Sequence, residues 1–357
     1  MGPAASTAAR RLVAPPRRSQ QTSVTAAPDR FDRGLDPRRS PFVPSYPDLR
    51  LLAVHAHPDD ESSKGAGTMS HYRGLGVDVM VATNTGGERG DILNAAMEGV
   101  PHAERDLPGY RRDEMRRAAE ALDIKHRWMG FMDSGLPEGD PLPPLPAGCF
   151  ALQPVEIAAA PLVKLIREFR PHVILTYDEN GGYPHPDHIQ THNVSMHAWQ
   201  TAGDPTKYPD LGEPWQPLKL YYDKAFNTER FIALHEAMTE RGLESPFAER
   251  IARIMETQDA EGNKAVLGAH PTTTKIFCPE SFSVREEALR CHETQVAPDS
   301  LFFAVSPEFQ AAAWPWEDYV LAESRVDSPV PETCLFAGIV DEVRPDPDYA
   351  PQPDWQI

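Results

Sequence analysis

Two short apolar segments, each followed at once by histidine and aspartate, constrain the fold of this chain most. Residues 51–54 (LLAV) precede the sequence HAHPDDE, and residues 172–177 (HVILTY) precede DENGGYPHPDH. Short apolar segments bounded by polar residues are typical of buried strands, and the small residues after the first segment favour a helix packed closely against it. Because ligands of α/β proteins bind at the carboxyl ends of the strands, both polar clusters are expected at one site.

The spacing within these clusters points to a metal centre. His57 and Asp60 are three residues apart, so both side chains can turn toward one point. The second cluster can supply a third ligand, for which we choose His188, because open catalytic zinc sites have three His, Asp or Glu ligands and a water. His192, four residues further on, could compete as a ligand, but we expect it outside the metal shell. Zn²⁺ is therefore the expected cofactor, and Fe²⁺ suits the same ligands.

Acid–base groups accompany the expected ligands. Asp59 lies between the two ligands in sequence, its side chain is expected to point in a different direction, and it could take the proton from an attacking water. The alternative is that Asp59 only caps a helix. Asp187 could fix the tautomer of His185 and favour an imidazolium that protonates a leaving amine. Tyr183 could donate a hydrogen bond to an oxyanion. These groups are sufficient for amide hydrolysis.

A glycine-rich loop at residues 85–90 follows the second expected strand. It lacks the GK[ST] sequence of a phosphate-binding loop, which argues against nucleotide binding. Its glycines would let the backbone approach a ligand closely. Glu88 in this loop is either a substrate contact or part of an ordinary turn, and the sequence favours neither.

Strand and helix patterns alternate over the first half of the chain. The alternation predicts an α/β fold with a Rossmann-like, mostly parallel sheet and helices on both faces. A smaller C-terminal α/β subdomain is expected to cover the site. The expected strands are residues 51–54, 77–83, 127–131 and 172–177, with a further strand near 215–226, and the expected helices are residues 64–75, 110–122, 156–169, 187–202, 228–241, 249–256, 284–294 and 307–314.

Composition suggests four parts. Residues 1–47 hold eight arginines and three aspartates, a net charge of +5, together with eight prolines, which is typical of a disordered basic extension. Residues 48–203 form the expected Rossmann-like metal-hydrolase core, and residues 204–340 the C-terminal subdomain that completes the substrate site. Residues 341–357 are a Pro-rich tail.

Overall charge and apolar content limit the partners and the compartment. The formal net charge of −18 argues against nucleic acid as a partner. No apolar run approaches the roughly 18 residues that a membrane span needs. Four widely spaced cysteines without a CxxC pair, and no secretion signal, indicate reduced thiols and a cytoplasmic protein. The oligomeric state is not indicated by the sequence.

The two metal motifs carry a resemblance to a known family. Residues 56–61 (AHPDDE) and 185–188 (HPDH) resemble the signatures of the zinc-dependent PIG-L or LmbE-like deacetylase family, over about residues 49–340. Within this family the chain is most similar to the mycothiol S-conjugate amidases. That closer likeness rests on residues 61–65, 85–90, 92–94, 111–115, 133–137, 176–184, 288–290, 294–295, 302–304 and 335–339.

The resemblance implies a set of roles for these residues. It implies zinc on the three ligands named above, Asp59 as general base, His185 as general acid oriented by Asp187, and Tyr183 at the oxyanion. It places contacts to glucosaminyl-inositol on residues that lie outside the two motifs, namely Arg112, Asp133 and Glu88. It also implies that Lys64 is a substrate-binding residue, at the position where the amidases differ from the sister deacetylases.

The implied reaction cleaves the amide between glucosaminyl-inositol and an N-acetylcysteine S-conjugate, a small-molecule thiol conjugate, in detoxification. Two readings compete with it. One is a deacetylase of N-acetylglucosaminyl-inositol or another amino sugar, or a tailoring amidase, which would share the metal chemistry. The other is a metalloprotein that has lost catalysis.

Overall fold

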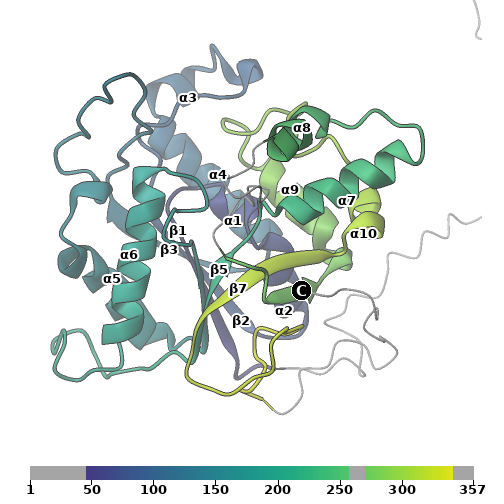
Figure 1. Ribbon diagram of the computed structural model, residues 1–357. Coiled ribbons are helices and arrows are strands. Elements are labelled where there is room, and N and C mark those ends of the chain that lie inside the picture. Colours follow the sequence, from purple (N-terminus) through teal and green to yellow (C-terminus); the bar gives the residue numbers. More distant parts are fainter. Residues whose placement is uncertain (1–45, 257–269, 341–357) are drawn as a thin grey trace, which may run out of the picture.

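Seven strands form a single sheet at the centre of the molecule (Figure 1). The computed structural model describes residues 46–256 and 270–340, so the expected basic extension, apart from its last two residues, and the Pro-rich tail lie outside the described residues. The strands are β1 (Arg50–His55), β2 (Asp78–Thr85), β3 (Lys125–Phe131), β4 (Val173–Thr176), β5 (Lys219–Asp223), β6 (Thr274–Phe277) and β7 (Trp316–Ser324).

The order of the strands is β3-β2-β1-β4-β5-β7-β6. The five strands from β3 to β5 are parallel, whereas β7 runs antiparallel to both β5 and β6. The chain moves outward from β1 in one direction and then from β4 in the other. The crevice between β1 and β4 is therefore the topological switch point, where α/β sheets bind their ligands.

Ten α-helices in the described residues surround the sheet. They are α1 (Asp60–Ser63), α2 (Ala66–Gly74), α3 (Pro101–Arg105), α4 (Leu107–Ala121), α5 (Val155–Phe169), α6 (Pro186–Thr201), α7 (Thr228–Thr239), α8 (Ala248–Glu256), α9 (Phe282–Arg290) and α10 (Pro307–Ala313). In Figure 1, α5 and α6 lie on one side of the sheet, and α7 and α10 lie toward the other. Each described helix that the patterns predicted is present, with ends shifted by a few residues.

Both faces of the parallel strands are buried, as the predicted fold class requires. In β1, Leu52 and Val54 contact the core formed with α5 and α6. The alternate residues Leu51 and Ala53 contact a second core, which includes residues of α2 and α4. Alternate side chains of β1 thus face two different cores. This packing fixes the orientation of the strand and therefore the position of His57 just beyond its end.

The sheet continues across the expected boundary at residues 203 and 204. β5 pairs with β4 from Val173–Lys219 to Thr176–Tyr222, and β7 and β6 extend the same sheet. The second half of the chain therefore contributes three strands to the central sheet, and its own small core lies among α7, α8 and the segment that leads into α10. The sequence patterns did not predict β6 and β7, whose hydrogen-bonding partners are distant in sequence or antiparallel.

Over the two described ranges, no helix combines the length and the apolar character that crossing a membrane requires.

Candidate active site

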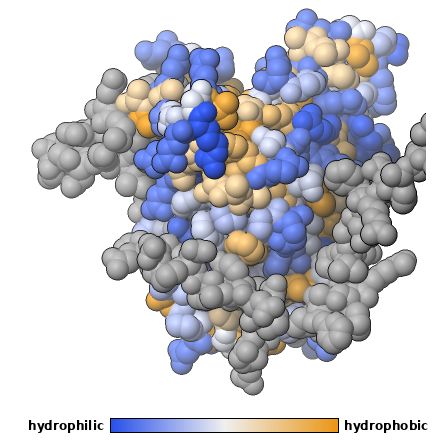
Figure 2. Space-filling model, turned by 90° about the vertical axis from the view of Figure 1, so that its right-hand side faces the viewer, coloured by the Kyte–Doolittle hydropathy of each residue, from blue (hydrophilic) through white to orange (hydrophobic). Residues whose placement is uncertain are grey.

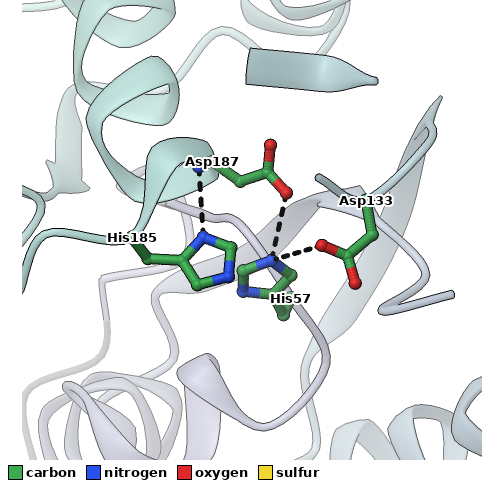
Figure 3. Close-up of side chains that lie close together, drawn as sticks. All are labelled: His57, Asp133, His185 and Asp187. Carbon is green, nitrogen blue, oxygen red and sulfur yellow. Dashed lines mark hydrogen bonds and ion pairs between the residues drawn. The ribbon is translucent and has the colours of Figure 1, made fainter. Parts of the chain in front are cut away.

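The predicted metal ligands and catalytic residues lie at the carboxyl ends of the parallel strands. His57 lies two residues beyond β1, Asp133 lies two residues beyond β3, and His185 and His188 follow β4 at the start of α6. These positions flank the switch point, so three segments separated by up to 131 residues converge there. Figure 3 shows His57, Asp133, His185 and Asp187 directed toward one another.

His57, Asp60 and His188 each offer one ligand atom, and these atoms lie within 4.8 Å of one another. Asp60 Oδ2 is 3.6 Å from His57 Nδ1 and 3.4 Å from His188 Nε2. All three residues are buried. The structure therefore brings together the three residues that the sequence motifs predict as metal ligands.

His188 is held in the tautomer that a metal ligand needs. Its Nδ1 lies 2.9 Å from the carbonyl oxygen of Gly181, which can only accept, so Nδ1 carries the proton. Nε2 is buried and has no hydrogen-bond partner among the described residues. Burial lowers the pKa of His188 well below its usual value, which keeps the ring neutral. Gly181 has a φ of +73°, and a Cβ there would lie 2.5 Å from His188 Cβ, so this approach requires glycine.

A second group of residues surrounds the other nitrogen of His57. His57 Nε2 lies 3.4 Å from both Asp133 Oδ1 and Asp187 Oδ2. Burial favours a neutral His57, but these two carboxylates and Asp60 outweigh it and raise the pKa of His57 well above its usual value. His57 Nε2 already has a hydrogen-bond partner in this group, Asp187, whereas His188 Nε2 has no hydrogen-bond partner among the described residues. The set of His57, Asp60 and His188 therefore fits a metal better than the second set of four residues that lies close enough, His57, Asp133, His185 and Asp187.

Asp59 adopts an unusual backbone conformation beside the cluster. Its φ of 96° lies in the left-handed region, which few residues other than glycine adopt. Asp59 precedes α1 at the capping position, but its side chain makes no capping hydrogen bond. Instead, its Oδ2 lies 3.2 Å from Arg111 Nη2. The alternative in which Asp59 serves only as a helix cap is therefore not supported by its contacts.

Asp187 contacts His185 differently from the prediction. The backbone N–H of Asp187 donates to His185 Nδ1 at 3.1 Å, so the proton of a neutral His185 is on Nε2 (Figure 3). The Asp187 carboxylate accepts instead from the backbone N–H groups of Ser134 and Ala151 and faces His57. Burial lowers the pKa of His185 to about 4, so the expected imidazolium is replaced by a neutral ring. The first turn of α6 directs the Asp187 carboxylate away from the His185 ring.

Lys64 lies behind the cluster and is not an open contact. Its Nζ donates to Asp60 Oδ1 at 2.5 Å, and the residue is almost fully buried. Tyr177 donates from its hydroxyl to Asp60 Oδ2 at 2.8 Å, and its ring stacks on His188 at 4.4 Å. Burial opposes charge on Asp60, but the Lys64 ammonium holds the pKa of this carboxyl well below its usual value. In this structure Lys64 therefore stabilises an ionised candidate ligand, and it does not face solvent as a substrate-binding residue would.

Arg111, and not the predicted Arg112, lies at the site in the structure. Arg112 is exposed on α4, with its guanidinium carbon 5.7 Å from the centre of the Trp128 ring. Arg111 is buried and donates from Nη2 to the carbonyl oxygen of Pro58 at 2.7 Å, next to Asp59. Successive residues of a helix are about 100° apart, so only one of two adjacent arginines can face the site. In this structure the Arg112 side chain therefore lies away from the site where it was expected.

Glu88 and Tyr183 take different positions at the margin of the site. Glu88 accepts from the backbone N–H groups of Gly86 and Asp133 at 3.1 and 3.0 Å, which braces its own loop. Tyr183 is 38% exposed, and its ring centre is 4.5 Å from that of His188. Burial raises the pKa of Tyr183 to about 12, so its hydroxyl keeps its proton at neutral pH. Tyr183 can therefore donate into the site, whereas Glu88 orders the loop.

A buried ion pair that the sequence does not predict joins Glu61 to His292. Glu61 Oε1 lies 2.6 Å from His292 Nε2, and both side chains are fully buried. Glu61 Oε2 accepts from the backbone N–H of Asp59 at 3.0 Å, so the pair also supports the left-handed residue. Glu61 belongs to the first motif, but nothing in the sequence connects it with His292, 231 residues away.

The fold and the cluster together define an α/β protein with a His–Asp–His site at the switch point of its sheet. Residues 52–199 match the PIG-L family, described as GlcNAc-PI de-N-acetylase. The mycothiol S-conjugate amidase of Streptomyces coelicolor is 52% identical over 295 residues, which cover 82% of this chain and 98% of that protein. The 1D-myo-inositol 2-acetamido-2-deoxy-alpha-D-glucopyranoside deacetylase of Streptomyces avermitilis is 37% identical over 299 residues, with the same coverage of both chains.

Among solved structures, the N,N'-diacetylchitobiose deacetylase of Pyrococcus horikoshii has a TM-score of 0.49 and 16% identity over 76% of this chain and 83% of that one. The chain belongs to the PIG-L family, as the extent and identity of its match to the amidase show. It is a hydrolase that acts on amides.

Proposed function

We propose that this protein is a zinc-dependent amidase that cleaves the amide between glucosaminyl-inositol and the N-acetylcysteine part of mycothiol S-conjugates. The observation that carries the proposal is the 52% identity to a mycothiol S-conjugate amidase, compared with 37% to a deacetylase over the same share of the chain. The products would be an N-acetylcysteine thioether and an amino sugar. The proposed role is thiol-based detoxification in the cytoplasm.

The residues proposed to hold the metal are His57, Asp60 and His188. Their support is the orphaned, buried Nε2 of His188 and the two-nitrogen, one-carboxylate donor set, which zinc accepts readily. When bound, the metal would polarise the amide carbonyl and lower the pKa of a water molecule toward neutrality. Asp133 and Asp187 would orient His57 through its other nitrogen.

The chain's own groups would move the protons. Asp59 takes a proton from the water that attacks the amide carbon, and Arg111 holds the Asp59 carboxylate in place during this step. His185 donates a hydrogen bond from Nε2 to the leaving nitrogen, and this nitrogen takes up the proton that Asp59 collected from the water. Tyr183 donates a hydrogen bond to the carbonyl oxygen as negative charge develops there. One water is consumed, and a carboxylic acid and an amine are formed.

A deacetylase of N-acetylglucosaminyl-inositol is the second candidate, because relatives 35–37% identical to this chain carry deacetylase names. Side-by-side hydrolysis by zinc-loaded protein separates the two. We expect kcat/KM for the conjugate to exceed that for the acetylated sugar by about 100-fold, the scale of discrimination that one pocket can provide. A preference for the acetylated sugar would reverse the assignment, and the Asp59→Asn variant controls for contaminating hydrolases.

A further inference from the structure

A cavity of about 260 Å³ lies beside α1. Its lining includes Ser62 and Ser63 of α1 and residues of α7, α9 and the segment before α10. Figure 2, which looks onto the side of the molecule that carries α7 and α10, shows apolar residues gathered between hydrophilic margins. The two exposed apolar residues of the lining, Leu301 and Phe302, are 61% and 44% exposed.

Aromatic side chains form much of the wall. Phe226, Phe231, Phe247, Phe302 and Phe303 all line the cavity. The rings of Phe231 and Phe247 are 5.3 Å apart. The Arg250 guanidinium lies 4.5 Å above the Phe231 ring, which helps to hold it in place. A wall of fixed rings favours an apolar ligand group, and an aromatic one above all.

One edge of the cavity is polar and positively charged. Arg230 Nη2 and Arg285 Nη2 both donate to Gln310 Oε1, at 2.9 and 2.7 Å. Arg285 also pairs with Glu317 at 3.3 Å. The one hydrogen-bond partner found for Arg230 among the described residues is this shared neutral amide oxygen, so its guanidinium can donate further hydrogen bonds to a ligand oxygen.

The cavity adjoins the candidate metal ligands. Phe226, in its wall, has its ring centre 5.9 Å from Lys64 Nζ, and that same Nζ bonds to Asp60 Oδ1. Ser62 and Ser63 follow Asp60 within α1. One side chain, Lys64, thus separates the wall of the cavity from a member of the cluster. A substrate whose amide carbonyl lies at the cluster could therefore extend a group a few bonds away toward the cavity.

We propose that this cavity binds the thioether arm of the substrate, with the sulfur substituent against the phenylalanines and the N-acyl oxygen near Arg230. This inference rests on the proposed function. The N-acetylcysteine conjugate carries both an apolar arm and a second amide oxygen, which match the two kinds of surface. An acetyl group has neither, so the cavity selects for conjugates with large apolar arms.

The test compares two mycothiol conjugates that differ only in the arm, S-methyl and S-benzyl. The parent is expected to show a kcat/KM at least about 10-fold higher for S-benzyl, through a lower KM. Phe302→Ala and Phe231→Ala should each lower kcat/KM for S-benzyl by about 3- to 10-fold and leave S-methyl unchanged. Ile157→Ala removes an exposed apolar side chain from α5, outside the cavity, and should change neither.

Calorimetric titration with the product-like S-benzyl-N-acetylcysteine gives a readout that does not need catalysis. If Phe302→Ala and Phe231→Ala bind this compound more weakly than the parent and Ile157→Ala do, the proposed arm site is supported even when neither conjugate is cleaved. Absence of cleavage would contradict the proposed function only. If both conjugates are cleaved and the cavity variants affect them equally or not at all, the amidase assignment stands and the arm site is wrong.

Discussion

Arg111 Nη2 lies 3.2 Å from Asp59 Oδ2 and also donates to the carbonyl oxygen of Pro58, so one buried guanidinium holds both the side chain and the backbone of the proposed base. The contact is possible because Gly87 leaves room, since a Cβ there would lie 2.0 Å from Arg111 Nη1. Arg112, the next residue, faces away from the site.

These adjacent arginines provide a matched pair of variants. Arg111→Ala should lower kcat by about 10- to 100-fold, because a misplaced catalytic group loses rate steeply with distance. Arg112→Ala should stay within about twofold of the parent, since its side chain is exposed. Steady-state kinetics on the conjugate, with circular dichroism to check folding, measures both. Equal losses in the two variants would show that Arg111 has no particular role in placing Asp59.

Replacement of Asp59 by Asn should remove the proposed base while preserving the backbone. Asn tolerates the left-handed conformation that Asp59 adopts, with its φ of 96°, better than Ala does. We expect kcat to fall by about 10²- to 10⁴-fold, the usual contribution of a general base. Zinc content should remain that of the parent. A variant that binds zinc and turns over at the parent rate contradicts the mechanism.

The buried pair of Glu61 and His292 should be important for stability. Burial favours the neutral acid, but His292 lowers the pKa of Glu61 to about 2, which keeps it charged. His292→Leu leaves this buried carboxylate without its cation and should reduce the free energy of unfolding by about 3–5 kcal/mol. Urea denaturation measures the loss, and the double variant Glu61→Leu/His292→Leu should recover part of it. A loss below about 1 kcal/mol in the single variant argues against a charged pair.

His172 should contribute to acid destabilisation. Burial, helped by the neighbouring Arg50, lowers the pKa of His172 to about 4 from 6.5, and its Nδ1 accepts from the Arg50 backbone. The unfolded chain therefore takes up a proton before the folded one does, so stability present above pH 6.5 is lost as the pH falls toward 4. His172→Asn should reduce the loss between pH 7.5 and 5 by about 1 kcal/mol, after allowance for partial exposure. Paired urea titrations at the two pH values test this, and an unchanged pH slope would contradict it.

The sequence was sufficient to predict the strands that end in the two motifs and the convergence of His57, Asp60 and His188. Each motif follows a buried strand, and parallel strands bring their carboxyl ends to one edge. The same reasoning could not choose between Arg111 and Arg112, because a helix pattern with an uncertain start does not fix which of two adjacent arginines faces inward. Asp187 was assigned to His185 by proximity in sequence, whereas the first turn of α6 directs its carboxylate to Ser134 and Ala151.

Long-range pairing explains the other differences. β6 and β7 join the sheet through antiparallel partners, and a four-residue strand such as Thr274–Phe277 has little pattern of its own. Lys64 was expected at the substrate, but α1 turns its ammonium onto Asp60, four residues earlier. Tyr177 and His292 gain their roles from contacts more than 100 residues away, with Asp60 and Glu61 respectively. Local sequence carries no signal for such contacts.

The most direct test of the account is a zinc titration of metal-free protein, followed by both metal binding and conjugate hydrolysis. One equivalent of zinc per chain should restore activity in the parent. His192→Ala should behave like the parent, because His192 bonds to the Tyr177 carbonyl away from the cluster. His188→Ala should lose tight zinc binding and activity together. Full zinc binding and parent activity in His188→Ala, or their loss in His192→Ala, would contradict the proposed metal centre.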